Sequence, residues 1–406
     1  MVVGQPNKDK LLPVPGIQLA STIAGIYKKP RPDLALISCA PGSRVAGVFT
    51  RNAFCAAPVH ISKKHLNSSS ISHLLINAGN ANAGTGSQGL EDALHSCQKL
   101  SGLVNGTSEQ ILPFSTGVIG EPLPVEKITA ALPVLLDSLN ESGWEAVAKA
   151  IMTTDTVMKG ISRQIKLNGT TVTITGIAKG SGMIRPDMAT MLAFIATDAD
   201  ISKPLLDSML REAVENSFNL ISVDGDTSTN DACMLIATGK SGAEILQDRN
   251  GNISEQFMGA LQEVCKYLAQ QIVRDGEGAT KFVTIKIEQA ASRQECLQVA
   301  TAIAHSPLVK TALFASDPNW GRILAAVGRA GLEKLDISRV NIRIGDIYIV
   351  TDGYRSPDYT EEQGRKLFSR PEILLTVTLG RGQHQIEFWT CDLSYDYVKI
   401  NAEYRT

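Results

Sequence analysis

Hydrophobic residues recur along the chain with two periods, one typical of helices and one typical of strands. Apolar residues at helical spacing follow a favourable helix start at Ser202, and a second such run extends from about Ser254 to Asp275. Residues 282–288 instead alternate between apolar and polar, which predicts a strand. The two helical stripes consist of Leu205, Leu206, Met209, Leu210, Ala213 and Val214, and of Phe257, Leu261, Val264, Leu268 and Ile272.

Two further strand-like segments lie near the C-terminus. Residues 373–379 and 385–391 flank the glycine-containing turn at residues 380–382 and predict a β-hairpin. No stretch reads as a linker, a low-complexity tract or a repeat. Because strands and amphipathic helices are mixed from end to end, we expect an α/β or α+β protein. Antiparallel sheet covered by helices fits this pattern better than regular βαβ alternation.

Composition narrows the class of protein. The 406 residues are 43% hydrophobic and 20% charged, which is ordinary for a globular chain of about two or three domain-sized units. No apolar run approaches the roughly 18 residues of a membrane span, and residues 1–8 lack the pattern of a secretory signal. The net charge of −2 argues against nucleic-acid binding. We therefore expect a soluble, cytoplasmic protein with no membrane or nucleic-acid partner.

Common catalytic and metal-binding motifs are missing. The seven cysteines include no C-x-x-C pair, and the six histidines form no cluster, so buried reduced thiols are expected rather than a metal site or disulfides. A G-x-G-x-x-G pattern spans Gly84–Gly89, but residues 77–83 separate it from the preceding strand. A dinucleotide site needs those glycines directly after the strand. A nicotinamide-dependent dehydrogenase is therefore a weak alternative, and this Asn- and Gly-rich segment is better interpreted as positive-φ turns.

The most unusual segment lies between an alternating strand at residues 171–175 and an apolar strand that begins at Thr190. A threonine hydroxyl is a weak nucleophile without an adjacent base. Cleavage of the chain just before the threonine supplies one, because the new α-amino group has a pKa of about 7.7–8.0. The small Ala189 would let the hydroxyl reach the preceding carbonyl. The simpler interpretation of the same residues is a turn between two strands.

The residues from Lys179 to Leu192 resemble the self-cleavage signature of the ornithine acetyltransferases, the glutamate N-acetyltransferases of arginine biosynthesis. The similarity extends over the whole chain, in matching order. Its small departures are Ala78, Gly84 and Asp187, where the family often has Ser, Cys and Asn. The other segments that carry it are residues 45–52, 56–59, 77–82, 115–124, 151–156, 224–231, 277–281, 317–322 and 400–406.

The resemblance implies a role for each matching residue. Thr190 would cut the chain after Ala189 and then carry acetyl from N2-acetylornithine to glutamate as an acetyl-Thr190 ester. The Thr116 hydroxyl and the Gly117 backbone N–H would stabilise the oxyanion. Lys179 is the cation among the implied substrate contacts, and the Glu277 carboxylate could balance a substrate ammonium. The implied substrate-binding residues are Thr153, Lys179, Thr190, Glu277, Asn401 and Thr406.

The same resemblance implies an organisation for the molecule. Residues 1–189 would form an α chain and residues 190–406 a β chain, associated as a heterotetramer of two α and two β chains. The expected fold is the layered αββα sandwich of N-terminal-nucleophile proteins with a smaller C-terminal α/β domain. Residues 190–285 would complete the sandwich, and residues 286–406 would form the smaller region.

No cofactor or metal is implied, although some members of the family also accept acetyl-CoA as an acetyl donor. No residue of this chain decides between the two donors. The closest alternative function is an N-terminal-nucleophile aminopeptidase or amidase of the same fold, in which water replaces glutamate as the acceptor. The alternative of a different class is the nicotinamide-dependent dehydrogenase. A non-enzymatic binding module is favoured least, and it would keep the chain in one piece.

Overall fold

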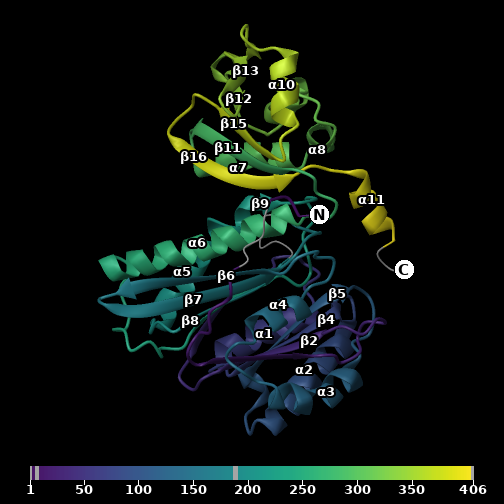
Figure 1. Cartoon of the computed structure of the whole chain (residues 1–406), viewed down its shortest axis with the longest axis vertical. Helices are drawn as coiled ribbons and strands as arrows, with labels where there is room; N and C mark the ends of the chain where they lie inside the picture. Colours follow the sequence, from purple (N-terminus) through teal and green to yellow (C-terminus); the bar gives the residue numbers. More distant parts are fainter. Residues whose placement is uncertain (1, 5–8, 186–190, 404–406) are drawn as a thin grey trace.

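The computed structural model describes residues 2–4, 9–185 and 191–403. Ala189, Thr190 and Thr406 therefore lie outside the described residues. Two sheets form the body of the molecule (Figure 1). The first has the strand order β1-β2-β4-β5, with β4 and β5 parallel and the other neighbours antiparallel. Its strands are β1 (Ile17–Thr22), β2 (Leu34–Cys39), β4 (His73–Asn80) and β5 (Ile111–Val118).

The second sheet draws its strands from widely separated parts of the sequence. Its order is β3-β10-β8-β7-β6, in which only β10 and β8 are parallel. Strands β8 and β10, from after residue 190, thus lie between strands from before it. The five strands are β3 (Arg44–Phe49), β6 (Lys159–Leu167), β7 (Thr170–Lys179), β8 (Leu192–Thr197) and β10 (Ala232–Ala237).

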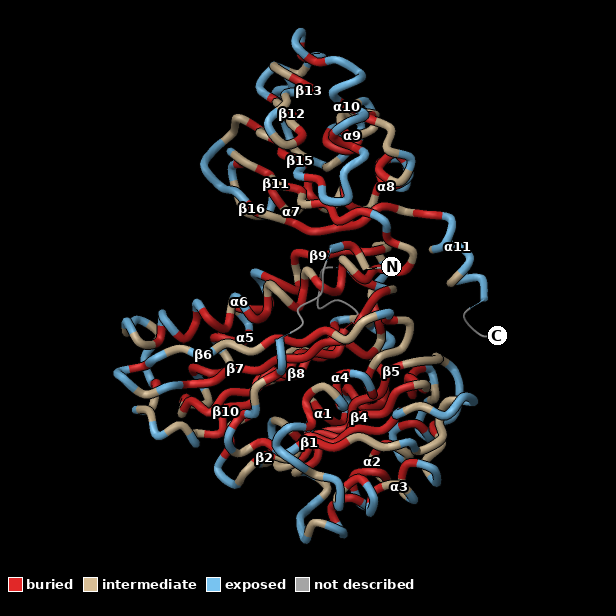
Figure 2. The backbone as a smooth tube through the Cα atoms, in the orientation of Figure 1, coloured by how far each residue is buried: buried red, intermediate tan, exposed pale blue. Residues whose placement is uncertain are grey.

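Alternating side chains make these two sheets the inner layers of a sandwich. Leu34 and Leu36 pack with helices on the outer face, whereas Ala35 and Ile37 pack into the core between the sheets. Phe114 and Phe194 meet edge to face across that core, with ring centroids 5.1 Å apart. Buried residues run along the strands of both inner sheets (Figure 2). The expected αββα order is therefore confirmed.

In the part of the chain that the structure describes, four helices cover the two outer faces, and two more contact both sheets. Both helices predicted from apolar spacing are present, and Ser202 is the N-cap of α5. All the predicted stripe residues of both helices are buried. The helices are α2 (Gly86–Leu103) and α3 (Val125–Asp137) on the first sheet, α5 (Lys203–Glu215) and α6 (Asn252–Arg274) on the second, and α1 (Ala57–Ser68) and α4 (Trp144–Ala150) beside them.

A third, mixed sheet forms the unit at the top of Figure 1. Its strand order is β14-β13-β12-β15-β11-β16-β9, and the short β9 comes from the part of the chain that otherwise builds the sandwich. The strands are β9 (Ile221–Ser222), β11 (Phe282–Ala290), β12 (Asn341–Ile344), β13 (Ile347–Thr351), β14 (Tyr354–Arg355), β15 (Glu372–Thr378) and β16 (His384–Cys391), with helices α7 (Arg293–Ala304), α8 (Pro307–Phe314), α9 (Trp320–Gly328), α10 (Glu361–Phe368) and α11 (Tyr395–Ala402).

The predicted C-terminal hairpin is wrong, although both of its strands exist. β11 lies between β15 and β16, parallel to the first and antiparallel to the second. The glycine turn carries the chain across the end of β11, where the Leu379 N–H donates to the Glu288 carbonyl and the Gly382 N–H to the Gln289 carbonyl. A turn pattern indicates that the chain reverses direction, but it does not show whether an earlier strand lies between the two strands that the turn connects.

Among the helices that the structure describes, none is both long enough and apolar enough to cross a membrane. Within the described ranges, no group of three histidine, cysteine or acidic residues is arranged to hold a metal ion. All seven cysteines are unpaired, six of them are buried, and Cys55 is half-buried.

Candidate functional site

Thr116 and Gly117 lie near the end of β5, where the pairing of β4 and β5 becomes irregular. Gly117 has a φ of 135°, a conformation that favours glycine. A Cβ atom there would lie 2.3 Å from the carbonyl carbon of Gly79 and 2.5 Å from the Asn80 nitrogen. Close backbone approach therefore requires glycine at this position, as expected for a residue that would present its N–H to a ligand.

Lys179 ends β7 and reaches Thr116 on the other sheet. Its side chain is buried, and Nζ donates a hydrogen bond to Thr116 Oγ1 at 3.2 Å. Burial lowers the pKa of Lys179, while the carboxylates of Asp155, Asp231 and Glu277 act in the opposite direction. Lys179 therefore has a desolvated amino group among acidic residues, with one hydrogen bond to the proposed oxyanion residue.

A buried ion triad supports the loop that carries Thr153. Lys159 Nζ lies 2.6 Å from Asp155 Oδ1 and 2.6 Å from Asp275 Oδ2, with all three side chains 0–1% exposed. Asp155 also accepts the Thr153 N–H at 3.0 Å and the Gly180 N–H at 2.7 Å. The triad thereby connects Thr153, and also the backbone after Lys179, to the end of α6.

The protonation states in the triad follow from opposing effects. Burial alone would raise the pKa of Asp155, but the charges of Lys159 and Lys179 outweigh it and hold that pKa below its ordinary range. Burial likewise acts to lower the pKa of Lys159, and the two carboxylates raise it above its usual value. Asp155 and Lys159 therefore both stay charged near neutral pH.

Glu277 approaches from the loop after α6. Its N–H donates to the Ser181 carbonyl at 2.8 Å, and its Oε2 accepts a hydrogen bond from Asn401 Nδ2 at 2.8 Å. A Cβ atom on Gly182 would lie 2.5 Å from the Glu277 carboxyl carbon, so the backbone after Lys179 passes directly against this carboxylate. Two of the predicted substrate residues, Glu277 and Asn401 of α11, are thus in direct contact.

Two aspartates of the 224–231 segment hold the backbone on both sides of residues 186–190. Asp224 accepts the N–H groups of Met183 at 2.5 Å and Ile184 at 2.9 Å. Asp231 accepts the N–H of Met191 at 2.9 Å. One short segment of sequence therefore anchors residues 183 and 184, which precede the proposed cleavage position by a few residues, and Met191, the second residue after it.

Most predicted site residues that the structure describes lie in one region. Thr116 contacts Lys179, Thr153 is tied to it through Asp155, and Glu277 contacts Asn401 and the backbone after Lys179. The sequence reasoning assigned no role to Asp155, Lys159, Asp275, Asp224 or Asp231. Asp155, Asp224 and Asp231 nevertheless belong to segments that carry the family resemblance, which was the available signal.

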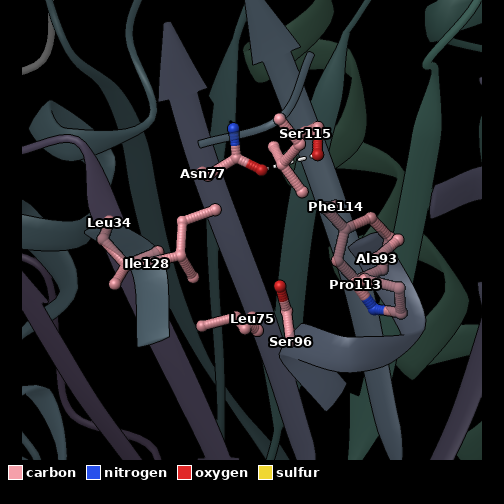
Figure 3. A pocket seen from close by; sticks show the side chains of 10 residues that line it. Leu34, Leu75, Asn77, Ala93, Ser96, Pro113, Phe114, Ser115 and Ile128 are labelled. Carbon is pink, nitrogen blue, oxygen red and sulfur yellow. Dashed lines mark hydrogen bonds between the residues drawn. The ribbon is translucent and has the colours of Figure 1, made fainter. Parts of the chain in front are cut away.

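The internal void in Figure 3 is not this site. It lies between β4, β5 and the helices of the outer layer, and the Ser115 hydroxyl donates to Asn77 Oδ1 beside it at 2.6 Å. Because side chains alternate along β5, Ser115 faces the void and Thr116 faces Lys179. The Asn- and Gly-rich segment that includes the end of β4 has the expected positive φ values at Gly79, Asn82 and Gly84.

Comparison with known proteins gives a consistent result over the whole length. The model of the ArgJ family matches residues 18–406. The arginine biosynthesis bifunctional protein ArgJ of Pseudomonas fluorescens (strain Pf0-1) is 54% identical over 406 residues, which is all of both chains. The ArgJ protein of Methylococcus capsulatus is 56% identical over 397 residues, 98% of this chain and 97% of that protein. A crystal structure of the ArgJ protein of Bacillus halodurans, 40% identical, covers 50% of this chain and 95% of its own, with a TM-score of 0.48. The chain therefore belongs to the ArgJ family.

Proposed function

We propose that the chain is a self-cleaving glutamate N-acetyltransferase of arginine biosynthesis, acting in the cytoplasm. Thr190 cuts the Ala189–Thr190 bond and then transfers acetyl from N2-acetylornithine to glutamate. Family membership supports the activity, because the relatives are named as bifunctional proteins of arginine biosynthesis. The observation that carries the site is the Thr116–Lys179 hydrogen bond beside Gly117, together with the anchoring of residues 184 and 191.

The strand order supports continued association after the cut. β8 and β10 from the second part lie between β7 and β3 from the first, with antiparallel pairing at both boundaries. Residues 1–189 carry 17 Lys and Arg against 12 Asp and Glu, and the remainder carries 22 against 29. Opposite charges of +5 and −7 add to the cohesion, but shared sheet and core are the larger contribution. We propose that two such αβ units assemble as a heterotetramer.

The reaction is a double displacement. The Thr190 hydroxyl attacks the acetyl carbonyl, its proton passes to the Thr190 α-amine, and ornithine leaves with a proton on its amine. The amine of glutamate then attacks the acetyl ester, and Thr190 recovers its hydroxyl. Both steps form an oxyanion, for which the Gly117 N–H and the Thr116 hydroxyl are the donors. Because Lys179 Nζ donates to Thr116 Oγ1, the hydrogen of that hydroxyl is free to point to the oxyanion.

The charges around the site suit amino-acid substrates. We propose that Glu277 contacts a substrate ammonium and Lys179 a carboxylate, with Thr153, Asn401 and Thr406 completing the contacts. The Asn401–Glu277 bond supports this assignment, because it brings the C-terminal helix α11 to the same carboxylate. Acetyl-CoA as a second acetyl donor stays part of the proposal.

A product assay tests this function. Purified protein is given N2-acetylornithine with and without glutamate, and in a parallel reaction acetyl-CoA with glutamate. We expect N-acetylglutamate and ornithine only when glutamate is present. Acetate formed at the same rate without glutamate would identify an amidase instead. Binding of NAD(P) without acetyl transfer would support the dehydrogenase alternative.

Gly117→Ala is expected to lower kcat by about 10²–10³-fold, as the loss of one oxyanion donor does elsewhere. The added methyl group would overlap the backbone of Gly79 and Asn80 and displace the Gly117 N–H. Gly120→Ala is the matched control, since Gly120 also has a positive φ but has open space around its Cβ position. Steady-state kinetics on both variants, with folding checked by circular dichroism, measures the effect. Equal loss in the two variants would show that backbone strain alone is responsible.

A further inference from the structure

The loop between β1 and β2 is held by one buried carboxylate. Asp33, at the end of this loop, is 1% exposed. Its Oδ1 accepts the Ala24 N–H at 2.6 Å, and its Oδ2 accepts the N–H groups of Ile26 at 2.6 Å and Tyr27 at 3.2 Å. Hydrogen bonds to a carboxylate are stronger than those between neutral groups, and three of them converge here. The backbone of residues 24–27 is therefore fixed in one conformation.

The side chains of this loop lie against the strand next to Gly117. A Cβ atom on Gly79 would lie 3.0 Å from Ile26 Cγ2 and 3.3 Å from both Cε1 and Cζ of Tyr27. Gly79 of β4 is also the residue that pairs with Gly117 of β5 and that a Cβ atom on Gly117 would overlap. Gly79 thus contacts both the Tyr27 ring and the proposed oxyanion backbone. The ring therefore supports the strand that fixes the Gly117 N–H.

Tyr27 also reaches the peptide group between Met152 and Thr153. Its hydroxyl donates a hydrogen bond to the Met152 carbonyl at 3.3 Å. The N–H of the same peptide group belongs to Thr153 and donates to Asp155 Oδ2 at 3.0 Å. Both polar atoms of this peptide group therefore have a partner, which fixes the backbone of Thr153.

Arg31 holds the tyrosine in this arrangement. Its guanidinium carbon lies 4.8 Å from the centroid of the Tyr27 ring, which is a cation–π contact. Its Nη2 donates to the Met152 carbonyl at 3.0 Å and to the Lys149 carbonyl at 3.4 Å, at the end of α4. A cation is favourable at the C-terminal end of a helix, where carbonyl groups lack partners. The loop is thus attached to α4 and to the segment that carries Thr153.

We propose that Tyr27 is a positioning residue for the acetyl-transfer reaction. Its ring supports the Gly117 backbone through Gly79, and its hydroxyl holds the peptide group before Thr153. The inference rests on the proposed function, in which the Gly117 N–H stabilises the oxyanion and Thr153 contacts the substrate. Because these two groups belong to different segments of the chain, a side chain that contacts both segments sets the distance between them. A small displacement of either group is costly in turnover.

The ring and the hydroxyl of Tyr27 can be removed separately. Tyr27→Phe keeps the ring and loses one hydrogen bond to the Met152 carbonyl. We expect KM for N2-acetylornithine to rise about three- to tenfold in Y27F, at a kcat within about twofold of the wild type. Tyr27→Ala removes both contacts, so we expect kcat to fall at least about tenfold as well. Steady-state kinetics is measured on protein whose cleavage has been confirmed by intact mass.

Tyr267→Ala is the matched control. Tyr267 is half-buried, as Tyr27 is, and it packs against the main core from α6, about two turns before the end of that helix. We expect Y267A to lower the midpoint of urea unfolding and to keep the wild-type kcat and KM. A loss of kcat in Y267A equal to that in Y27A would overturn the inference, because truncation of any half-buried tyrosine would then impair the enzyme.

The remaining outcomes separate the two roles of Tyr27. Wild-type kcat and KM in Y27A would overturn the inference, and so would a Y27F protein whose kcat is as low as that of Y27A, because the ring would then contribute nothing. If Y27A does not fold or is not cleaved, Y27F still decides, since an unchanged KM for N2-acetylornithine would contradict the role of the hydroxyl. A wild-type protein without acetyl transfer would overturn the proposed function, and this inference with it.

Discussion

Thr190→Ala is expected to leave a single 406-residue chain and to abolish acetyl transfer. The proposed cut and the proposed turnover use the same hydroxyl, so one substitution removes both. Intact-mass spectrometry of freshly expressed protein should show two fragments that meet at Ala189 and Thr190 for the wild type and none for the variant. Steady-state assays with N2-acetylornithine and glutamate should show no turnover above the uncatalysed rate.

Thr190→Ser is the control, because it keeps a hydroxyl and removes only the methyl group. We expect this variant to be cut and to retain turnover at a reduced rate. Two fragments in the T190A sample would show that another residue or a contaminating protease cuts the chain. A variant that is uncut yet turns over normally would separate catalysis from cleavage and contradict the N-terminal-nucleophile mechanism.

Local sequence patterns predicted the helices and strands themselves better than they predicted which elements lie next to one another. The stripes of α5 and α6 give the buried face directly, because helical spacing depends only on residues close in sequence. The prediction of a C-terminal hairpin was wrong because β11, which begins about ninety residues before β15, lies between β15 and β16. The sequence pattern of residues 373–391 does not indicate that β11 pairs with both strands.

The site shows the same division. The resemblance named Thr116 and Lys179, but their contact joins two sheets and rests on the packing of the whole sandwich. Asp155 and Lys159 are four residues apart, yet they meet on the approach to β6 rather than along a helix. Their third partner, Asp275, comes from the far end of α6. No spacing rule connects such residues, so this ion triad could be found only in three dimensions.

Lys159→Met should destabilise the folded protein by about 3–5 kcal/mol, the usual effect of removing one partner from a buried ion pair. The variant leaves Asp155 and Asp275 buried at 0–1% exposure without the cation that both contact at 2.6 Å. Asp155 also fixes the N–H groups of Thr153 and Gly180, so substrate affinity should fall as well. Urea unfolding followed by circular dichroism measures the change in the free energy of unfolding.

Lys203→Met is the matched control, because Lys203 contacts Asp207 at the same 2.6 Å but with side chains 42% and 28% exposed. An exposed pair of this kind contributes less than about 1 kcal/mol, so the contrast isolates burial.

The difference in the free energy of unfolding between K159M and the wild type should also shrink as the pH falls from 7 towards 4. In the wild type, the lysines overcome the effect of burial and hold the pKa of Asp155 low, so its contribution is present above its unfolded pKa of about 3.9 and is lost as the pH falls through the folded value. Without Lys159 the effect of burial on the pKa of Asp155 is opposed less strongly, so we expect Asp155 to take up a proton at a higher pH than in the wild type, which relieves the unpaired charge. A penalty in K159M that is no larger than in K203M, or that grows on acidification, would show that the triad is not the buried ion pair on which this expectation rests.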